Sequence, residues 1–347
     1  MHTPLQLRCW EGYEAPDFLE PFTRQTGIEV HAETLLSDAD AAEQLLRNST
    51  SCDVINMNNA YVQKVLHEAG LVRSLEGHLV EIAESHLLDV FTRFKSWMHA
   101  SNGRTCIGIG QRFGPFNLVV NTKRVSPALA QDQGFSLAED PGARFGVLRY
   151  EDFNIFHIAI AAGLNPFAPM TEAQKISFAD KAMEWFSRAQ VVSDSHFELN
   201  SALLKGEIDF YLSGGVYTVS PARRDGHNHL VAVTPKAGPI DGRGGIAFAE
   251  ITSVVSTTKQ LDEAHKFLSF VLEPQSAVQI AMSETTCNPV AQMGNPKVFS
   301  QFRAEALNVI QWETLEEDLE RCADYDLVPD HDELLALLRA AASARVG

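Results

Sequence analysis

The sequence predicts an α/β protein that is divided into two lobes. Between Leu5 and Gly70, short strand-like segments alternate with segments of helical spacing. This β-α-β order is typical of an open sheet of parallel strands with helices on its faces. A second stretch of the same kind follows Asn121, and 347 residues exceed what one simple core usually holds.

Helix-boundary residues and alternation define the elements of the first stretch. Pro16 marks a helix start, because proline is tolerated in the first turn, and Gly70 lies just past a helix end, where glycine is favoured. The predicted strands are 5–10, 27–32 and 52–57. One predicted helix starts at Pro16, and two others cover 41–48 and 61–68.

Residues 107–114 lead into 118–121, and this region is expected to cross between the lobes as two strands joined by a glycine-marked loop. Ser213–Gly215 is also predicted to be a loop. The second stretch is predicted to contain strands 146–148, 207–212 and 230–235, a return strand that opens at 244–246, and the β-branched segment 251–256. Its predicted helices are 154–162, 173–189, 194–206, 264–272 and 276–282, followed by a mainly helical tail, 302–346.

Two loops of the first stretch, 10–13 and 58–61, follow predicted parallel strands. Ligands of open α/β sheets bind at the carboxyl ends of the strands. We therefore expect these loops, which contain aromatic and amide side chains, to face a ligand.

The formal charge of −17 argues against nucleic acid as a partner, because binding it requires clustered Lys and Arg. The charge is compatible with attracting cations, although acidity more often serves solubility. No segment approaches the roughly 20 apolar residues that span a bilayer. Residues 1–4 lack the basic and apolar segments of a signal peptide, so the chain is either cytosolic or starts where a signal peptide was removed.

The five cysteines are predicted to be neither metal ligands nor nucleophiles. They are widely spaced, without a C-x-x-C pair, and a buried inert thiol is the default for those in apolar strands. His227 and His229 stand two apart, but beside charged neighbours they are more typical of a solvated turn. We expect no metal and no cofactor.

The sequence contains no catalytic motif of the serine hydrolase, zinc protease or P-loop type. Gly108 and Gly110 are not followed by the glycine pattern of a dinucleotide site. Glu151 and Asp152 are adjacent, and in an extended segment their side chains would point opposite ways. The protein is predicted not to be an enzyme, and a cytosolic α/β enzyme is the alternative.

A series of short motifs resembles, in order, the spermidine/putrescine-binding branch of ABC-importer solute-binding proteins. The motifs cover most of residues 5–290. They are W-x-x-Y at 10–13, T-G-I-x-V at 26–30, D-V followed by Tyr at 53–61, F-G followed by V-N-T at 113–122, K-G-E-x-D at 205–209, and A-x-K-F with a following Pro at 264–274.

The resemblance implies a two-lobed, periplasmic-binding-protein-like type II fold with a ligand cleft between lobes that close by hinge motion. The implied lobes are 1–118 plus 246–300, and 119–245 plus 301–347. It also implies a periplasmic or other extracytoplasmic location, a removed signal peptide and a membrane permease as partner. We expect a monomer. A signalling receptor in place of the permease stays open, and a ferric-ion-binding protein is disfavoured because no Tyr-Tyr pair occurs.

A polyamine site needs aromatic faces and carboxylates. The resemblance implies that the aromatic rings and the carboxylates at positions matching the family's ligand contacts bind the ligand. The alternative for each aromatic residue is that it packs on its own lobe, and the alternative for each carboxylate is that it is a surface charge. The implied contacts are Trp10, Tyr13, Phe113, Phe248, Glu250 and one of Glu151 or Asp152.

Departures from the family pattern leave the ligand class open. Ala60 and Gly214 replace aromatics, whereas Asn58, Asn59 and Ser213 add neutral hydrogen-bonding groups. Arg112 in the crossing loop, or Arg243, could pair with a ligand carboxylate, and the alternative for each is a solvated loop charge. The ligand is therefore either polyamine-like or a zwitterion such as an amino-acid-like compound or an opine.

Overall fold

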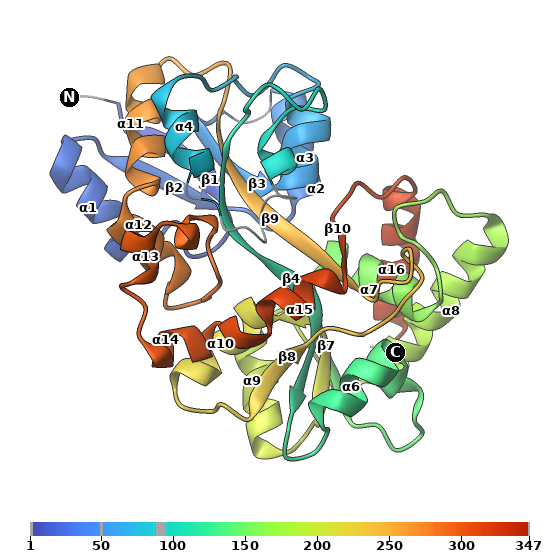
Figure 1. Cartoon of the computed structure of the whole chain (residues 1–347). Coiled ribbons are helices and arrows are strands. Elements are labelled where there is room, and N and C mark those ends of the chain that lie inside the picture. The colour runs from blue at the N-terminus through green and yellow to red at the C-terminus, as the bar shows by residue number, and fades with distance from the viewer. Residues whose placement is uncertain (1–2, 49–50, 86, 88–94, 346–347) are drawn as a thin grey trace. The chain divides into compact units, whose positions relative to one another are not determined.

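Two long strands carry the chain between its two units. The computed structural model describes residues 3–48, 51–85, 87 and 95–345. Unit 1 comprises Met1–Phe113 and Phe248–Leu307, and unit 2 comprises Gly114–Ala247 and Asn308–Gly347. Strands β4 (Ile109–Asn121) and β9 (Gly245–Val254) each have residues in both units (Figure 1).

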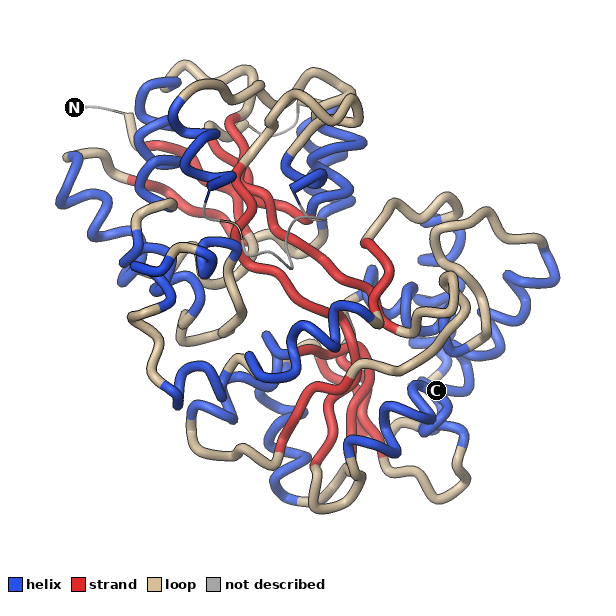
Figure 2. The backbone as a smooth tube through the Cα atoms, in the orientation of Figure 1, coloured by secondary structure: helices blue, strands red, loops and turns tan. Residues whose placement is uncertain are grey.

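The sheet of unit 1 is parallel at its centre. Strand β1 (Leu5–Cys9) pairs in parallel with β2 (Val30–Thr34) and with β3 (Val54–Asn58). Figure 2 shows the strands of the protein in red and its helices in blue. Strand β9 runs antiparallel to β3, with Asn58 opposite Glu250. The carboxyl ends of β1, β2 and β3 therefore meet at one edge of the sheet, which also contains Glu250.

Helices cover both faces of this sheet. Helix α1 starts at Pro16 and ends at Thr26, and the next residue, Gly27, has a φ of 74° that suits glycine. Phe18 and Phe22 of α1 pack against Phe267 and Phe270 of α11 (Leu261–Val271), with ring centroids 5.2 to 6.1 Å apart. The helical elements of this unit are α1 (Pro16–Thr26), α2 (Asp38–Leu46), α3 (Asn59–Tyr61), the π-helical turn η1 (Val62–Leu66), α4 (His78–Ser85), η3 (Ser96–Met98), α11 (Leu261–Val271), α12 (Pro274–Ala281), η5 (Ala291–Gly294), α13 (Pro296–Phe299) and α14 (Ala304–Val309), which runs across the boundary into unit 2.

The sheet of unit 2 is mixed. Strand β5 (Phe145–Leu148) pairs in parallel with β6 (Val191–Ser193) and β7 (Phe210–Gly215). Strand β4 is antiparallel to β7 and to β8 (Leu230–Val233). Strand β10 (Cys322–Asp324) pairs with the first residues of β9.

The C-terminal helix of unit 2, α16 (His331–Ala344), lies against α7 (Glu151–Ala161) and α8 (Glu172–Arg188). Helix α8 begins with a capping box between Thr171 and Gln174. No helix in the described part of the chain is long and apolar enough to cross a bilayer. The other helical elements are α6 (Pro127–Gln133), η4 (Gly134–Glu139), α9 (His196–Lys205), α10 (Val216–Arg224), η6 (Trp312–Thr314) and α15 (Leu315–Glu320).

Several predicted boundaries are wrong, because tertiary pairing overrides the local glycine signal. Strand β4 is continuous from Ile109 to Asn121 and has no crossing loop. Gly108 marks a close approach, since a Cβ there would collide with Ser253 and Ile251. Ser213–Gly215, which was predicted to be a loop, ends β7 because Gly215 pairs with Phe116.

All five cysteines are buried and free. Burial raises the pKa of the Cys52 thiol to about 12 and that of the Cys106 thiol to about 11. Burial also raises the pKa of Cys9 well above its usual range. These thiols are therefore protonated and shielded at neutral pH.

The buried carboxylate of Asp53 fastens three segments of unit 1. Its Oδ1 accepts a hydrogen bond from Thr258 Oγ1 at 2.5 Å. Its Oδ2 accepts one from the backbone N–H of Gln6 at 2.8 Å and one from Gln260 Nε2 at 3.0 Å. One side chain thus ties β1, the start of β3 and the loop before α11.

Replacing Asp53 with alanine is expected to destabilise the protein by about 1 to 3 kcal/mol, because three donors lose their acceptor. The free energy of unfolding in urea measures this effect. The matched control is Glu29→Ala, an exposed carboxylate for which a change within about 0.5 kcal/mol is expected. Equal stability of the two variants would contradict the role of Asp53.

Candidate functional site

A buried carboxylate joins the loops at the carboxyl edge of the unit 1 sheet. Asp38, the first residue of α2 after β2, is fully buried. Its Oδ1 accepts hydrogen bonds from Trp10 Nε1 at 3.1 Å and from the backbone N–H of Asn58 at 3.2 Å. Its Oδ2 accepts one from Asn58 Nδ2 at 2.6 Å. Asp38 therefore brings together two residues that the sequence predicted at the site, Trp10 and Asn58.

Asp38 is a residue of this edge that the sequence patterns did not identify. A signal was available, because Ser37 is an N-cap and its Oγ accepts from the backbone N–H of Asp40. A helix that begins directly after the second parallel strand places its first residues at the ligand edge.

Arg112 and Glu250 form a buried ion pair in unit 1. Arg112 Nε donates to Glu250 Oε2 at 2.9 Å, and Nη2 donates to Oε1 at 3.1 Å. The exposed fractions of the two side chains are only 3% and 7%. The interpretation of Arg112 as a solvated loop charge is therefore wrong, because the residue lies inside β4 and is held by β9.

The phenol ring of Tyr13 covers the guanidinium of Arg112. Arg112 Cζ lies 4.5 Å from the ring centroid, which is the distance of a cation–π contact. The backbone N–H of Arg112 donates to the Tyr13 hydroxyl at 3.4 Å, and Arg112 Nη1 lies 3.5 Å from Thr286 Oγ1. We call the Tyr13 ring face and the Glu250 carboxylate together the cation seat of unit 1.

The electrostatics of the cation seat follow from burial and from these contacts. Burial would lower the pKa of the Arg112 guanidinium, but the attraction of Glu250 raises it above its ordinary value. Burial, with Glu250 nearby, raises the pKa of Tyr13 well above its usual range. Burial also raises the pKa of Glu11, and the positive charge of Arg112 partly offsets this increase. Arg112 is thus permanently charged and Tyr13 neutral.

Gly12 leaves room for this arrangement. Its φ is 97°, a backbone conformation that residues with a side chain rarely adopt. A Cβ there would lie 2.7 Å from Ser283 Oγ and 3.1 Å from Arg112 Nη1. A side chain at position 12 would therefore compete with the guanidinium for space.

The other predicted residues of unit 1 lie in its interior. Phe113 and Phe248 are 0% and 3% exposed. Asn59 Oδ1 accepts from the backbone N–H of Ala249 at 3.3 Å, which ties α3 to β9. These three residues have structural contacts within the unit.

In unit 2, the predicted ligand carboxylates pair with helix α16. Glu151 accepts two hydrogen bonds from Arg339, each of 2.7 Å. Asp152 Oδ1 lies 2.8 Å from His331 Nε2. The expectation that these neighbours point opposite ways is wrong, because they form the first turn of α7 and both pair with α16.

Ser213 is fully buried at the end of β7 with a φ of 64°. Its Oγ accepts from Asn154 Nδ2 at 2.8 Å and lies 3.2 Å from His157 Nδ1. Burial lowers the pKa of His157 to about 3, so this imidazole is neutral. Ser213 therefore belongs to a buried polar cluster of unit 2, whereas Arg243 is exposed.

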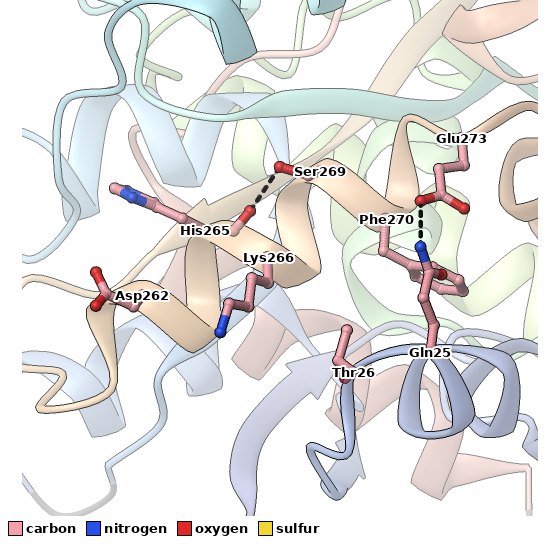
Figure 3. Close-up of a pocket in the computed structure, with 8 residues that line it drawn as sticks. All are labelled: Gln25, Thr26, Asp262, His265, Lys266, Ser269, Phe270 and Glu273. Atoms are coloured by element: carbon pink, nitrogen blue, oxygen red, sulfur yellow. Dashed lines mark hydrogen bonds between the residues drawn. The ribbon is translucent and has the colours of Figure 1, made fainter.

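A shallow pocket of about 450 Å³ lies elsewhere on unit 1, between α1 and the α11–α12 segment (Figure 3). Gln25 Nε2 donates to Glu273 Oε1 at 2.9 Å across it. It contains none of the residues predicted from the sequence, and most of its polar side chains are exposed. Its lining residues are Gln25, Thr26, Asp262, His265, Lys266, Ser269, Phe270 and Glu273.

Removing either partner of the buried pair is expected to cost about 3 to 5 kcal/mol, because the other charge stays buried without its counterion. Arg112→Ala and Glu250→Ala should each show this loss in urea unfolding. The double variant should lose less than the sum of the two single losses. Additive losses would show that the two side chains do not interact.

Stability is expected to fall as the pH rises through the pKa of His331. The hydrogen bond with Asp152 raises the pKa of His331, although burial opposes it. A raised pKa in the folded state gives a stabilisation that is complete below the unfolded value of about 6.5 and is lost above the folded value. Urea unfolding between pH 5 and 9 should show this decline in wild type and in His31→Gln, an exposed control, but not in His331→Gln.

No protein-family model matches this sequence, and no curated protein matches it either. Solved structures do match it, at low sequence identity.

The spermidine/putrescine ABC transporter substrate-binding protein PotD from Streptococcus pneumoniae is 15% identical, with a TM-score of 0.69 over 98% of this chain and 100% of that chain. The TpPotD lipoprotein of Treponema pallidum is also 15% identical, with a TM-score of 0.72 over 98% and 99%. The PBP MotA from A. tumefaciens B6, solved in complex with glucopine, is 14% identical, with a TM-score of 0.64 over 99% and 100%. The predicted α/β, periplasmic-binding-protein-like fold is thus confirmed.

Proposed function

We propose that the chain is the extracytoplasmic solute-binding protein of an ABC importer and that it captures a small amine-containing solute. In this role it is a monomer that delivers the solute to a membrane permease. The proposal includes no catalytic step and no cofactor.

The fold supports the general role. PotD from Streptococcus pneumoniae is a spermidine/putrescine ABC transporter substrate-binding protein, and MotA was solved with glucopine. Both align with nearly all of this chain. Fold similarity supports a role more strongly than it supports a ligand, so the solute class must come from the site itself.

The proposed class of solute rests on the groups at the carboxyl edge of the unit 1 sheet. Glu14, Glu250 and Arg112 act electrostatically both on the thiol of Cys9 and on the carboxyl group of Glu11, so three carboxylates and one guanidinium lie close together here. The half-buried indole of Trp10 is fixed at this edge by Asp38. An edge with more carboxylate than guanidinium and a fixed aromatic ring suits a cationic amine.

A zwitterionic solute is the second candidate because of Arg243. Its side chain is exposed, and it forms no ion pair with any residue in the described ranges. A guanidinium in this state is available to hold a carboxylate in bidentate fashion. Arg112, in contrast, already holds Glu250.

A thermal-shift screen tests the proposal. An amine that binds only the folded protein is expected to raise Tm by mass action. Putrescine, spermidine, guanidino compounds, basic amino acids and opines form the panel. A shift with polyamines supports the first candidate, and a shift confined to carboxylate-bearing amines that is lost in Arg243→Ala supports the second.

Trp10→Ala is expected to lose the shift, whereas Ile176→Ala is the matched control, because Ile176 is exposed on α8 of unit 2. No shift with any member of the panel would contradict the proposed solute class. An equal loss in both variants would show that the shift does not report on the edge of unit 1.

A further inference from the structure

The environment of Arg112 has the features with which proteins bind a cationic solute. A guanidinium lies over the face of an aromatic ring and against both oxygens of one carboxylate. Ring face and carboxylate are the two groups that recognise ammonium and guanidinium ligands. Here the cation belongs to the protein.

We infer that Arg112 is a resident cation that fills the cation seat of unit 1 and thereby excludes the amine of a solute from Tyr13 and Glu250. Arg112 is therefore a specificity-determining residue, and the seat is a guanidinium site that becomes available when the Arg112 side chain is removed. The role in specificity rests on the proposed function, whereas the existence of the site does not.

The hydrogen bonds show that the seat is fully occupied. Glu250 uses Oε2 for Arg112 Nε and Oε1 for Arg112 Nη2. The ring of Tyr13 closes one face of the guanidinium at 4.5 Å. Arg112, Glu250 and Tyr13 are 2%, 5% and 2% exposed, so a solute cannot reach the carboxylate without displacing the guanidinium.

The surroundings show that the seat is shaped for this group. Gly12 has no side chain where a Cβ would lie 3.1 Å from Arg112 Nη1, and Thr286 Oγ1 lies 3.5 Å from the same nitrogen. Arg112 lies in β4 and Glu250 in β9, so both ends of the ion pair come from rigid strands. Removing the Arg112 side chain would leave an enclosed space of guanidinium size beside the Glu250 carboxyl group.

The consequence for the solute is a restriction on where its amine binds. Glu250 is neutralised by Arg112, and the oxygens of Asp38 already accept hydrogen bonds from Trp10 and Asn58, whereas Glu11 and Glu14 also lie near this edge. Glu14 Oε2 accepts from the backbone N–H of Gly12 at 2.6 Å, and Glu11 is half-buried. An amine that approaches unit 1 therefore meets these groups and Trp10, not the cation seat.

Chemical rescue tests the inference with methylguanidinium as the probe. At about ten times its dissociation constant, this ion is expected to raise the Tm of Arg112→Ala by about 2 to 4 °C relative to NaCl of equal concentration. Wild type should show a smaller shift than Arg112→Ala, because Arg112 fills the seat and only the proposed solute site can take up the ion. The double variant Arg112→Ala/Glu250→Gln, which lacks the carboxylate, is the matched control and should show a shift no larger than that of wild type.

Two results would overturn the inference. One is a saturable shift of the same size in wild type and in Arg112→Ala, and the other is an undiminished shift in the double variant. Should Arg112→Ala not fold, Arg112→Gln serves the same comparison, because its shorter side chain still leaves the Tyr13 face open. Failure of the solute screen with wild type would overturn the proposed function alone, since the rescue requires no natural solute.

Discussion

The buried ion pair between Arg112 and Glu250 is the interaction on which the rest of the site depends. Two charges that are almost completely removed from water are tolerated only when their geometry is good and their remaining hydrogen-bonding groups are satisfied. That requirement fixes the Tyr13 ring, the absence of a side chain at Gly12, and the alignment of β4 with β9. The side chains around the pair, at the carboxyl edge of unit 1, therefore have few alternative positions.

The same principle operates in unit 2 with different partners. Glu151 and Asp152 begin α7, where negative charge is favoured by the helix dipole, and they are paired with Arg339 and His331 of α16. The carboxylates that resemble ligand contacts in the sequence therefore have internal partners in each unit. Residue type and position in a motif indicate a ligand group, but partners supplied by distant segments decide whether the group is available.

Local pattern was enough to predict the α/β class, the parallel strands β1, β2 and β3, and the position of Trp10 and Asn58 at the ends of strands. The predicted loop 58–61 is wrong, because Asn58 ends β3 and helix α3 follows directly. It was not enough for the pairing of Arg112 with Glu250, because these residues are 138 positions apart and nothing local links them. Gly108 was misinterpreted for a related reason. A glycine that permits close strand packing and a glycine that permits a turn look the same in one sequence.

The buried state of the cysteines has a practical consequence. Because all five native thiols are covered, and the pKa of Cys52 and of Cys106 is raised by burial, maleimide reagents have little to react with on the folded protein. A single cysteine engineered on the surface of each unit can therefore carry a fluorophore in the wild-type background. Energy transfer between the two dyes then reports the separation of the units in solution, with and without solute.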